Sequence, residues 1–82
     1  MKPNVSDAVI VHGENYNGTH EHPALITRVW EDKDTSKGAV SINVTMFPDG
    51  GGEPQFISSL QLFDSREEAF KAAPGRRVAF WA

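Results

Sequence analysis

The sequence contains no cysteine, which excludes both a disulfide framework and a thiolate metal site in a chain of 82 residues. A domain of this size buries only about 60–65% of the surface that its unfolded chain exposes. Apolar strands or self-association must therefore supply the stability that disulfides give to other small domains. The absence of cysteine also favours a reducing, intracellular environment.

Long apolar runs and excess positive charge are absent too. No run approaches the ~20 apolar residues of a membrane span, and the first residues lack the apolar stretch of a signal peptide. The chain has eight Lys and Arg residues and eleven Asp and Glu residues, which gives a net charge of −3. Because nucleic-acid binding depends on neutralising phosphates, this balance disfavours it. We expect one soluble domain, residues 1–82, in the cytoplasm, with no membrane contact.

What the chain does contain is a series of short runs rich in β-branched and aromatic residues, separated by polar turns. In the third run Val40, Ile42 and Val44 alternate with polar residues, so one face is predicted to lie in the core. At Ser58 and Ser59 the alternation breaks, which predicts a β-bulge. The predicted strands span residues 7–12, 24–30, 39–47, 55–62 and 77–82.

One helix is predicted over residues 65–73. Ser65 and Glu68 have the spacing of a capping box, and Pro74 ends the helix. Phe70 is its predicted anchor on the sheet. Five strands with a long first loop and a short helix before the last strand favour a mainly β fold, a small SH3-like antiparallel barrel, with another small antiparallel barrel or meander as the alternative.

Strand parity also predicts the hydrophobic core. Apolar residues of one parity in each run are predicted to face the interior, and Phe70 of the helix is predicted to pack with them. The predicted core residues are Val9, Val11, Ile26, Val40, Ile42, Val44, Phe56, Leu60, Phe70, Val78 and Phe80.

Several motifs resemble a group of small bacteriophage proteins. They are the strand that begins His22-Pro-Ala, the Asn43-Val-Thr strand and the turn Phe47-Pro-Asp-Gly-Gly. The resemblance covers about two thirds of the chain, while the helix and the ending Phe80-Trp-Ala depart from the group's pattern. It implies a viral origin and a small barrel, and it supplies no catalytic residue.

The residues give little support for catalysis or for metal binding. His20-Glu21-His22, together with His12, offers ligands to a divalent metal, but histidines at this spacing are common in solvent-facing loops. There is no cysteine nucleophile and no serine in a strand-turn-helix elbow. We therefore expect a protein that is not an enzyme and that carries no cofactor and no metal.

Two features suggest phosphate binding, each with a simpler alternative. The glycines at 50–52 can form an anion nest, although a hairpin turn is favoured because the helix and Lys of a phosphate-binding loop do not follow them. Arg76 and Arg77, with Lys71 and Arg66, can form a positive edge, although short basic runs are usually only solvated.

The stronger signal is the combination of a long loop with aromatic residues. Residues 13–22 are rich in Gly and Asn and show no periodicity, which predicts a loop, and loops of this length are often functional. Neighbouring aromatics can line a groove for an extended peptide, or can instead close the barrel ends. The candidate binding residues are Tyr16, His20, His22, Trp30, Phe47, Arg76, Arg77 and Trp81.

Three functional hypotheses follow. The first is a non-enzymatic, phage-encoded module that binds a host or virion protein through the 13–22 loop and nearby aromatics. The second is a protein that sequesters a small phosphate-containing ligand, such as a nucleotide immune signal, and so blunts host defence. The third is a structural component of the virion. Exposed strand edges add self-association to the expected behaviour.

Overall fold

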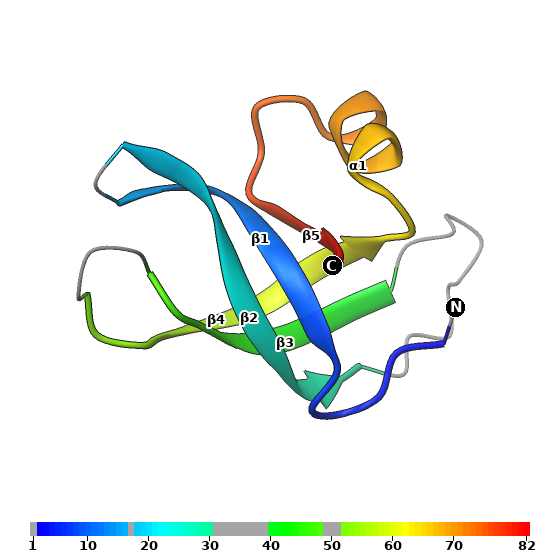
Figure 1. Cartoon of the computed structure of the whole chain (residues 1–82). Coiled ribbons are helices and arrows are strands. Elements are labelled where there is room, and N and C mark those ends of the chain that lie inside the picture. Colours follow the sequence, from blue (N-terminus) through cyan, green and yellow to red (C-terminus); the bar gives the residue numbers. More distant parts are fainter. Residues whose placement is uncertain (1, 17, 31–39, 49–51) are drawn as a thin grey trace.

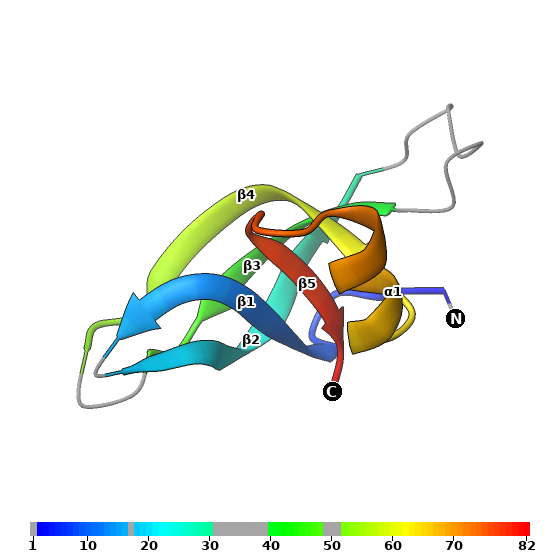
Figure 2. The ribbon, with the colours of Figure 1, turned by 90° about the horizontal axis from the view of Figure 1, so that it is seen from above.

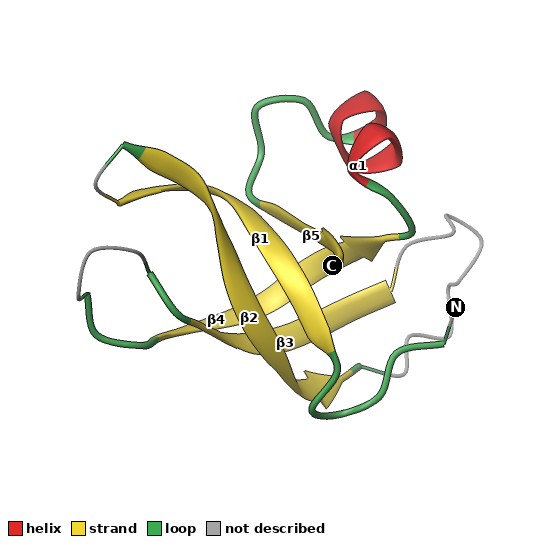
Figure 3. Ribbon diagram, viewed as in Figure 1, coloured by secondary structure: helices red, strands yellow, loops and turns green. Residues whose placement is uncertain are grey.

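The computed structural model describes residues 2–16, 18–30, 40–48 and 52–82, and they form five strands and one helix (Figure 1). Figure 3 shows that strands dominate the chain, with the helix between the last two. The prediction of a mainly β chain with one short helix before the last strand is confirmed. In chain order the elements are β1 (Ala8–Tyr16), β2 (Thr19–Val29), β3 (Val40–Met46), β4 (Gln55–Phe63), α1 (Arg66–Ala72) and β5 (Val78–Trp81).

The strands close into a barrel in the order β1-β2-β3-β4-β5, which is consistent with the predicted small SH3-like barrel. Strands β1 to β4 pair as an antiparallel meander. The last strand, β5, closes the barrel by pairing antiparallel with β1 and parallel with β4. The parallel pair departs from the antiparallel prediction, and it arises because α1 carries the chain back to the start of a parallel strand.

Two apolar clusters hold this fold together. The larger fills the barrel and includes Val9, Ile42 and Val44, none of which has solvent-exposed surface. The smaller lies outside the barrel under α1, where Ala69 packs with Phe80. Most of the predicted core is confirmed; the exceptions are Val40 and Phe70, which are half-buried, and Phe56, which is exposed.

The predicted bulge in β4 is confirmed, and it explains the error at Phe56. Ile42 pairs with Leu60 and Val44 with Ile57, so two residues of β4 face one residue of β3. Ser59 takes up the irregularity with a φ of 58°. Because the bulge changes the strand parity, Ile57 lies in the barrel and Phe56 lies outside it.

The helix α1 begins as its capping box predicts. The backbone N–H of Glu68 donates to Oγ of Ser65 at 3.2 Å, and Ser65 has the extended conformation of an N-cap residue. Phe70 lies between the rings of His12 and Phe80, at centroid distances of 4.6 and 6.2 Å. This helix is too short to span a membrane, and the described residues contain no other helix.

The predicted loop at residues 13–22 is wrong. Strand β1 continues to Tyr16 and β2 begins at Thr19, so the segment is the end of a β-hairpin. The pairing shifts between His12 and Tyr16, where Gly13 has a φ of 120°. The Gly and Asn content of residues 13–22 resembled that of a loop because the irregular part of the hairpin also needs a residue with positive φ.

Candidate functional site

The largest exposed apolar side chains of the sheet lie together on the outer face of β2, β3 and β4. Leu25 and Phe47 are each 42% exposed, and Phe56 is 66% exposed. Thr45 pairs with Leu25 on one side and with Phe56 on the other, so these three side chains form a row across three strands. Phe47 lies two residues beyond Thr45, and its N–H donates to the carbonyl of Pro23 at 2.9 Å.

We define this apolar face as Pro23, Leu25, Thr45, Phe47 and Phe56. Its members alternate along their strands with buried residues of the barrel interior, so their side chains point outward. Residues directly opposite in a sheet have Cβ atoms about 5 Å apart, and diagonal neighbours lie about 7–8 Å apart. The five side chains therefore form one continuous surface.

Trp30 borders the apolar face through a buried asparagine. Its Nε1 donates to Oδ1 of Asn43 at 2.8 Å, and the same oxygen accepts a bond from the N–H of Ser59 at 2.9 Å. Asn43 thus joins the end of β2 to the bulge of β4. The guanidinium of Arg28 lies 3.8 Å above the ring of Trp30, which places a cation beside the apolar face.

Replacing Asn43 with Ala should destabilise the protein by about 1–3 kcal/mol, because two N–H groups lose their acceptor. Urea unfolding followed by circular dichroism measures the loss. Asn43→Asp is the matched control, since it keeps an oxygen in the same position and should lose less. Equal losses in the two variants would show that the shared oxygen does not stabilise the bulge.

A shallow groove adjoins Arg28. It has a volume of about 440 Å³ and lies between the N-terminal segment and the end of β2. Lys2 and Arg28 are its charged residues, so the groove has a positive lining. The complete lining is Lys2, Pro3, Asn4, Val5, Thr27, Arg28 and Val29.

The histidines do not form the predicted loop site. His22 is only 1% exposed, and its Nε2 lies 2.7 Å from the carbonyl oxygen of Glu14, which accepts its hydrogen bond. The prediction of a solvent-facing His22 is therefore wrong, because the hairpin turns this side chain inward. His20 is exposed on β2, and the side chain of Tyr16 lies outside the described part of the structure.

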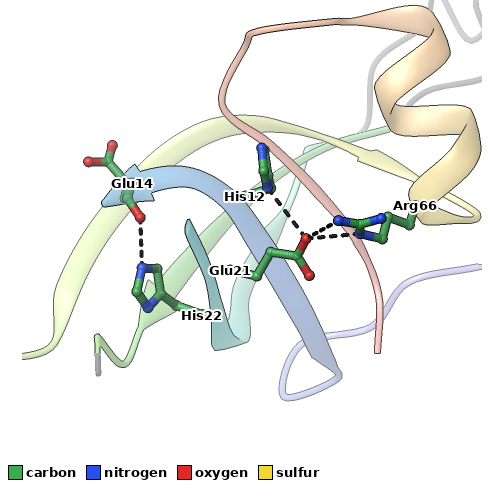
Figure 4. A network of polar contacts seen from close by, with 5 residues as sticks. All are labelled: His12, Glu14, Glu21, His22 and Arg66. Atoms are coloured by element: carbon green, nitrogen blue, oxygen red, sulfur yellow. Dashed lines mark hydrogen bonds and ion pairs between the residues drawn. The ribbon is translucent and has the colours of Figure 1, made fainter. Parts of the chain in front are cut away.

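Figure 4 shows a second polar cluster on the hairpin. Nδ1 of His12 lies 3.6 Å from Oε2 of Glu21, and the same oxygen accepts bonds from Nε and Nη2 of Arg66, each at 2.8 Å. This cluster ties α1 to the hairpin. Across the described residues, no three His, Asp or Glu side chains are placed to hold a metal ion.

The remaining predicted binding residues are separated from the apolar face. Arg76 and Arg77 are exposed before β5, and Nη1 of Arg77 pairs with Oε1 of Glu14 at 2.6 Å. Trp81 is half-buried against the interior cluster of the barrel, as the core alternative predicted. Of the predicted residues, the structure brings Phe47 and Trp30 to the same outer face and leaves the others apart.

Sequence reasoning missed Leu25, Phe56 and Arg28. Leu25 stands between Ala24 and Ile26 in an unbroken apolar run, which signals a strand with apolar residues on both faces. Phe56 could have been found from the parity of Ile57 once the bulge was placed. Arg28 has no such signal, because its position above Trp30 depends on the register shift in the pairing of β2 with β3, which falls between Ile26 and Arg28.

Comparison with known proteins gives no relative: no family model, curated protein or solved structure matches the chain. The resemblance to small bacteriophage proteins stays a prediction. The apolar face itself is therefore the basis for a proposal about function.

Proposed function

We propose that the protein is a non-enzymatic binding module that recognises another protein through the apolar face. The observation that carries this proposal is the row formed by Leu25, Thr45 and Phe56, with Phe47 beside it. Single exposed apolar residues are normal, but a contiguous group that includes aromatics is typical of interaction sites. This surface replaces the 13–22 loop as the proposed recognition element.

The border of the face indicates the chemistry of the partner. Arg28 stacks on Trp30 at one end, and the positive groove lies beyond it. An extended segment with apolar side chains for Leu25 and Phe47, followed by a carboxylate near Arg28, would match this arrangement.

The biological setting is part of the same proposal. The resemblance to small bacteriophage proteins supports a viral origin, a host or virion protein as the partner, and action in the host cytoplasm. The sequestering hypothesis has less support, because Arg77 pairs with Glu14 and His22 is buried. No observation favours a structural role in the virion.

The test is selection of peptides from a random display library on the immobilised protein, followed by binding measurements with variants. We expect the double variant Leu25→Ser and Phe47→Ser to weaken the selected peptides at least about tenfold, since each side chain is a central anchor. Both side chains are exposed, so the loss of stability should be small.

The matched control is Glu67→Ala with Lys71→Ala, two exposed positions on α1. This variant should bind the selected peptides as the parent does. The proposal is contradicted if no peptide is enriched, or if the α1 variant loses binding while the apolar-face variant keeps it.

A further inference from the structure

Strand β4 has a backbone edge that no strand in the described part of the chain covers. One side of β4 pairs with β3 from Gln55 to Leu62, while the other side pairs with β5 only at Leu62 and Phe63. Residues 55–58, well before this pair begins, therefore have a free side. Figure 2 shows this part of β4 running along the margin of the molecule.

The pattern of hydrogen bonds identifies the residues that face this edge. The N–H of Phe47 donates to Pro23 of β2, so Thr45 and Phe47 direct their backbone groups toward β2. In an antiparallel sheet the direction alternates, so Val44 and Met46 bond to their β4 partners Ile57 and Gln55. Position 56 lies between Gln55 and Ile57, and position 58 follows Ile57. Both positions therefore direct their N–H and C=O groups to the free edge.

Residues 55–58 of β4 lack the usual protection of an edge strand. Gln55–Phe63 contains no charged residue, no proline and no glycine, although 23% of the chain is charged. Native edges are commonly protected by charges, by prolines or by bulges. Here Pro54 stands before the strand and the bulge interrupts it at Ser59, which leaves residues 55–58 as a short, uncharged edge.

We propose that this edge binds the same edge of a second copy of the chain, in an antiparallel β4–β4 pair with two-fold symmetry. The occupant is a second copy because the two edges meet without like charges, although each chain carries a net charge of −3. A two-fold antiparallel pair also matches an edge to itself, donor to acceptor.

The register follows from the position of the proline. When Phe56 lies opposite Ser58 of the second copy, all four edge N–H groups meet a carbonyl. A register that places Phe56 opposite itself would put Ser58 against Pro54, which has no N–H to donate. We therefore place the two-fold axis at Ile57.

The dimer would join the apolar faces of the two copies. Phe56 belongs both to the free edge and to the row with Thr45 and Leu25. The continuous sheet would carry this row across both subunits and double the surface available to a partner. The self-association does not depend on the proposed partner binding, which needs only one apolar face.

Sedimentation equilibrium of the intact chain tests the dimer. At tens of micromolar we expect a species of twice the 9.0 kDa of the chain, and a monomer for Ser58→Pro, which removes an edge N–H. Leu25→Lys is the control: β2 is paired on both sides, so this variant should dimerise while losing the selected peptides.

Disulfide trapping tests the register without the proline, and the absence of native cysteine makes it specific. Oxidising a mixture of Phe56→Cys and Ser58→Cys should give a cross-linked dimer in higher yield than either variant alone, because the proposed register places these positions opposite each other. A monomeric parent at tens of micromolar, or a mixture that cross-links no better than its components, would overturn the proposal.

Discussion

Truncating Ile42 to Ala is expected to destabilise the protein by about 2–5 kcal/mol. Ile42 has no solvent-exposed surface, and it pairs with Val29 on β2 and Leu60 on β4 in the middle of the barrel. The loss combines removed apolar burial with the cavity that remains. Because small domains are stable by only about 5–15 kcal/mol, this single change should produce a large fall in the urea midpoint.

Val5→Ala is the control for Ile42→Ala, since Val5 is an exposed aliphatic residue. Its urea midpoint should stay near that of the parent. If the two variants unfold at the same urea concentration, Ile42 does not lie in the core that the barrel defines.

Replacing Gly13 with Ala should destabilise the protein by roughly 2–5 kcal/mol, for two separate reasons. Gly13 has a φ of 120°, a conformation that residues with a Cβ rarely adopt. An added Cβ would also lie 2.9 Å from Cα of Arg77, so the backbone before β5 would have to move. The shift of this segment should also weaken the ion pair between Arg77 and Glu14.

Gly18→Ala separates these two causes. Gly18 has a φ of 81°, but among the described residues, its own chain neighbours aside, no atom lies within 4 Å of an added Cβ. This variant should lose only the conformational part, about 1–2 kcal/mol. Thermal or urea unfolding of both variants provides the measurement, and a Gly18 variant as unstable as the Gly13 variant would show that the approach of Arg77 has no energetic effect.

Local patterns in the sequence were sufficient for much of the fold. The alternation at Ile42 and Val44 placed β3 correctly, and the capping box of Ser65 placed the start of α1. The broken alternation at Ser58 and Ser59 predicted the bulge. Each of these signals lies within a few residues of the structure that it specifies, so no knowledge of distant contacts was needed.

The errors concern features that depend on contacts between distant parts of the chain. The irregular hairpin at Gly13 depends on the close approach of Arg77 near the other end of the sequence. The burial of His22 depends on the carbonyl of Glu14 across the hairpin. Both residues looked like loop residues because their partners could not be identified from neighbouring positions.

The apolar face was predicted in part. Phe47 was recognised as an aromatic residue on an otherwise polar strand face, and it lies on the outer surface. Leu25 and Phe56 were missed because the register between β2, β3 and β4 decides which exposed residues are neighbours. A register is a property of the folded sheet, and the sequence constrains it only weakly where both faces of a strand are apolar.

Chemical-shift mapping tests the proposed recognition surface most directly. The ¹⁵N-labelled protein would be titrated with a peptide enriched in the selection, and its amide signals followed. We predict that the largest shifts occur at Leu25, Thr45, Phe47 and Phe56, the residues that form the apolar face. Shifts confined to His20, to Arg76 and Arg77 or to α1, with those four signals unmoved, would contradict recognition through this face.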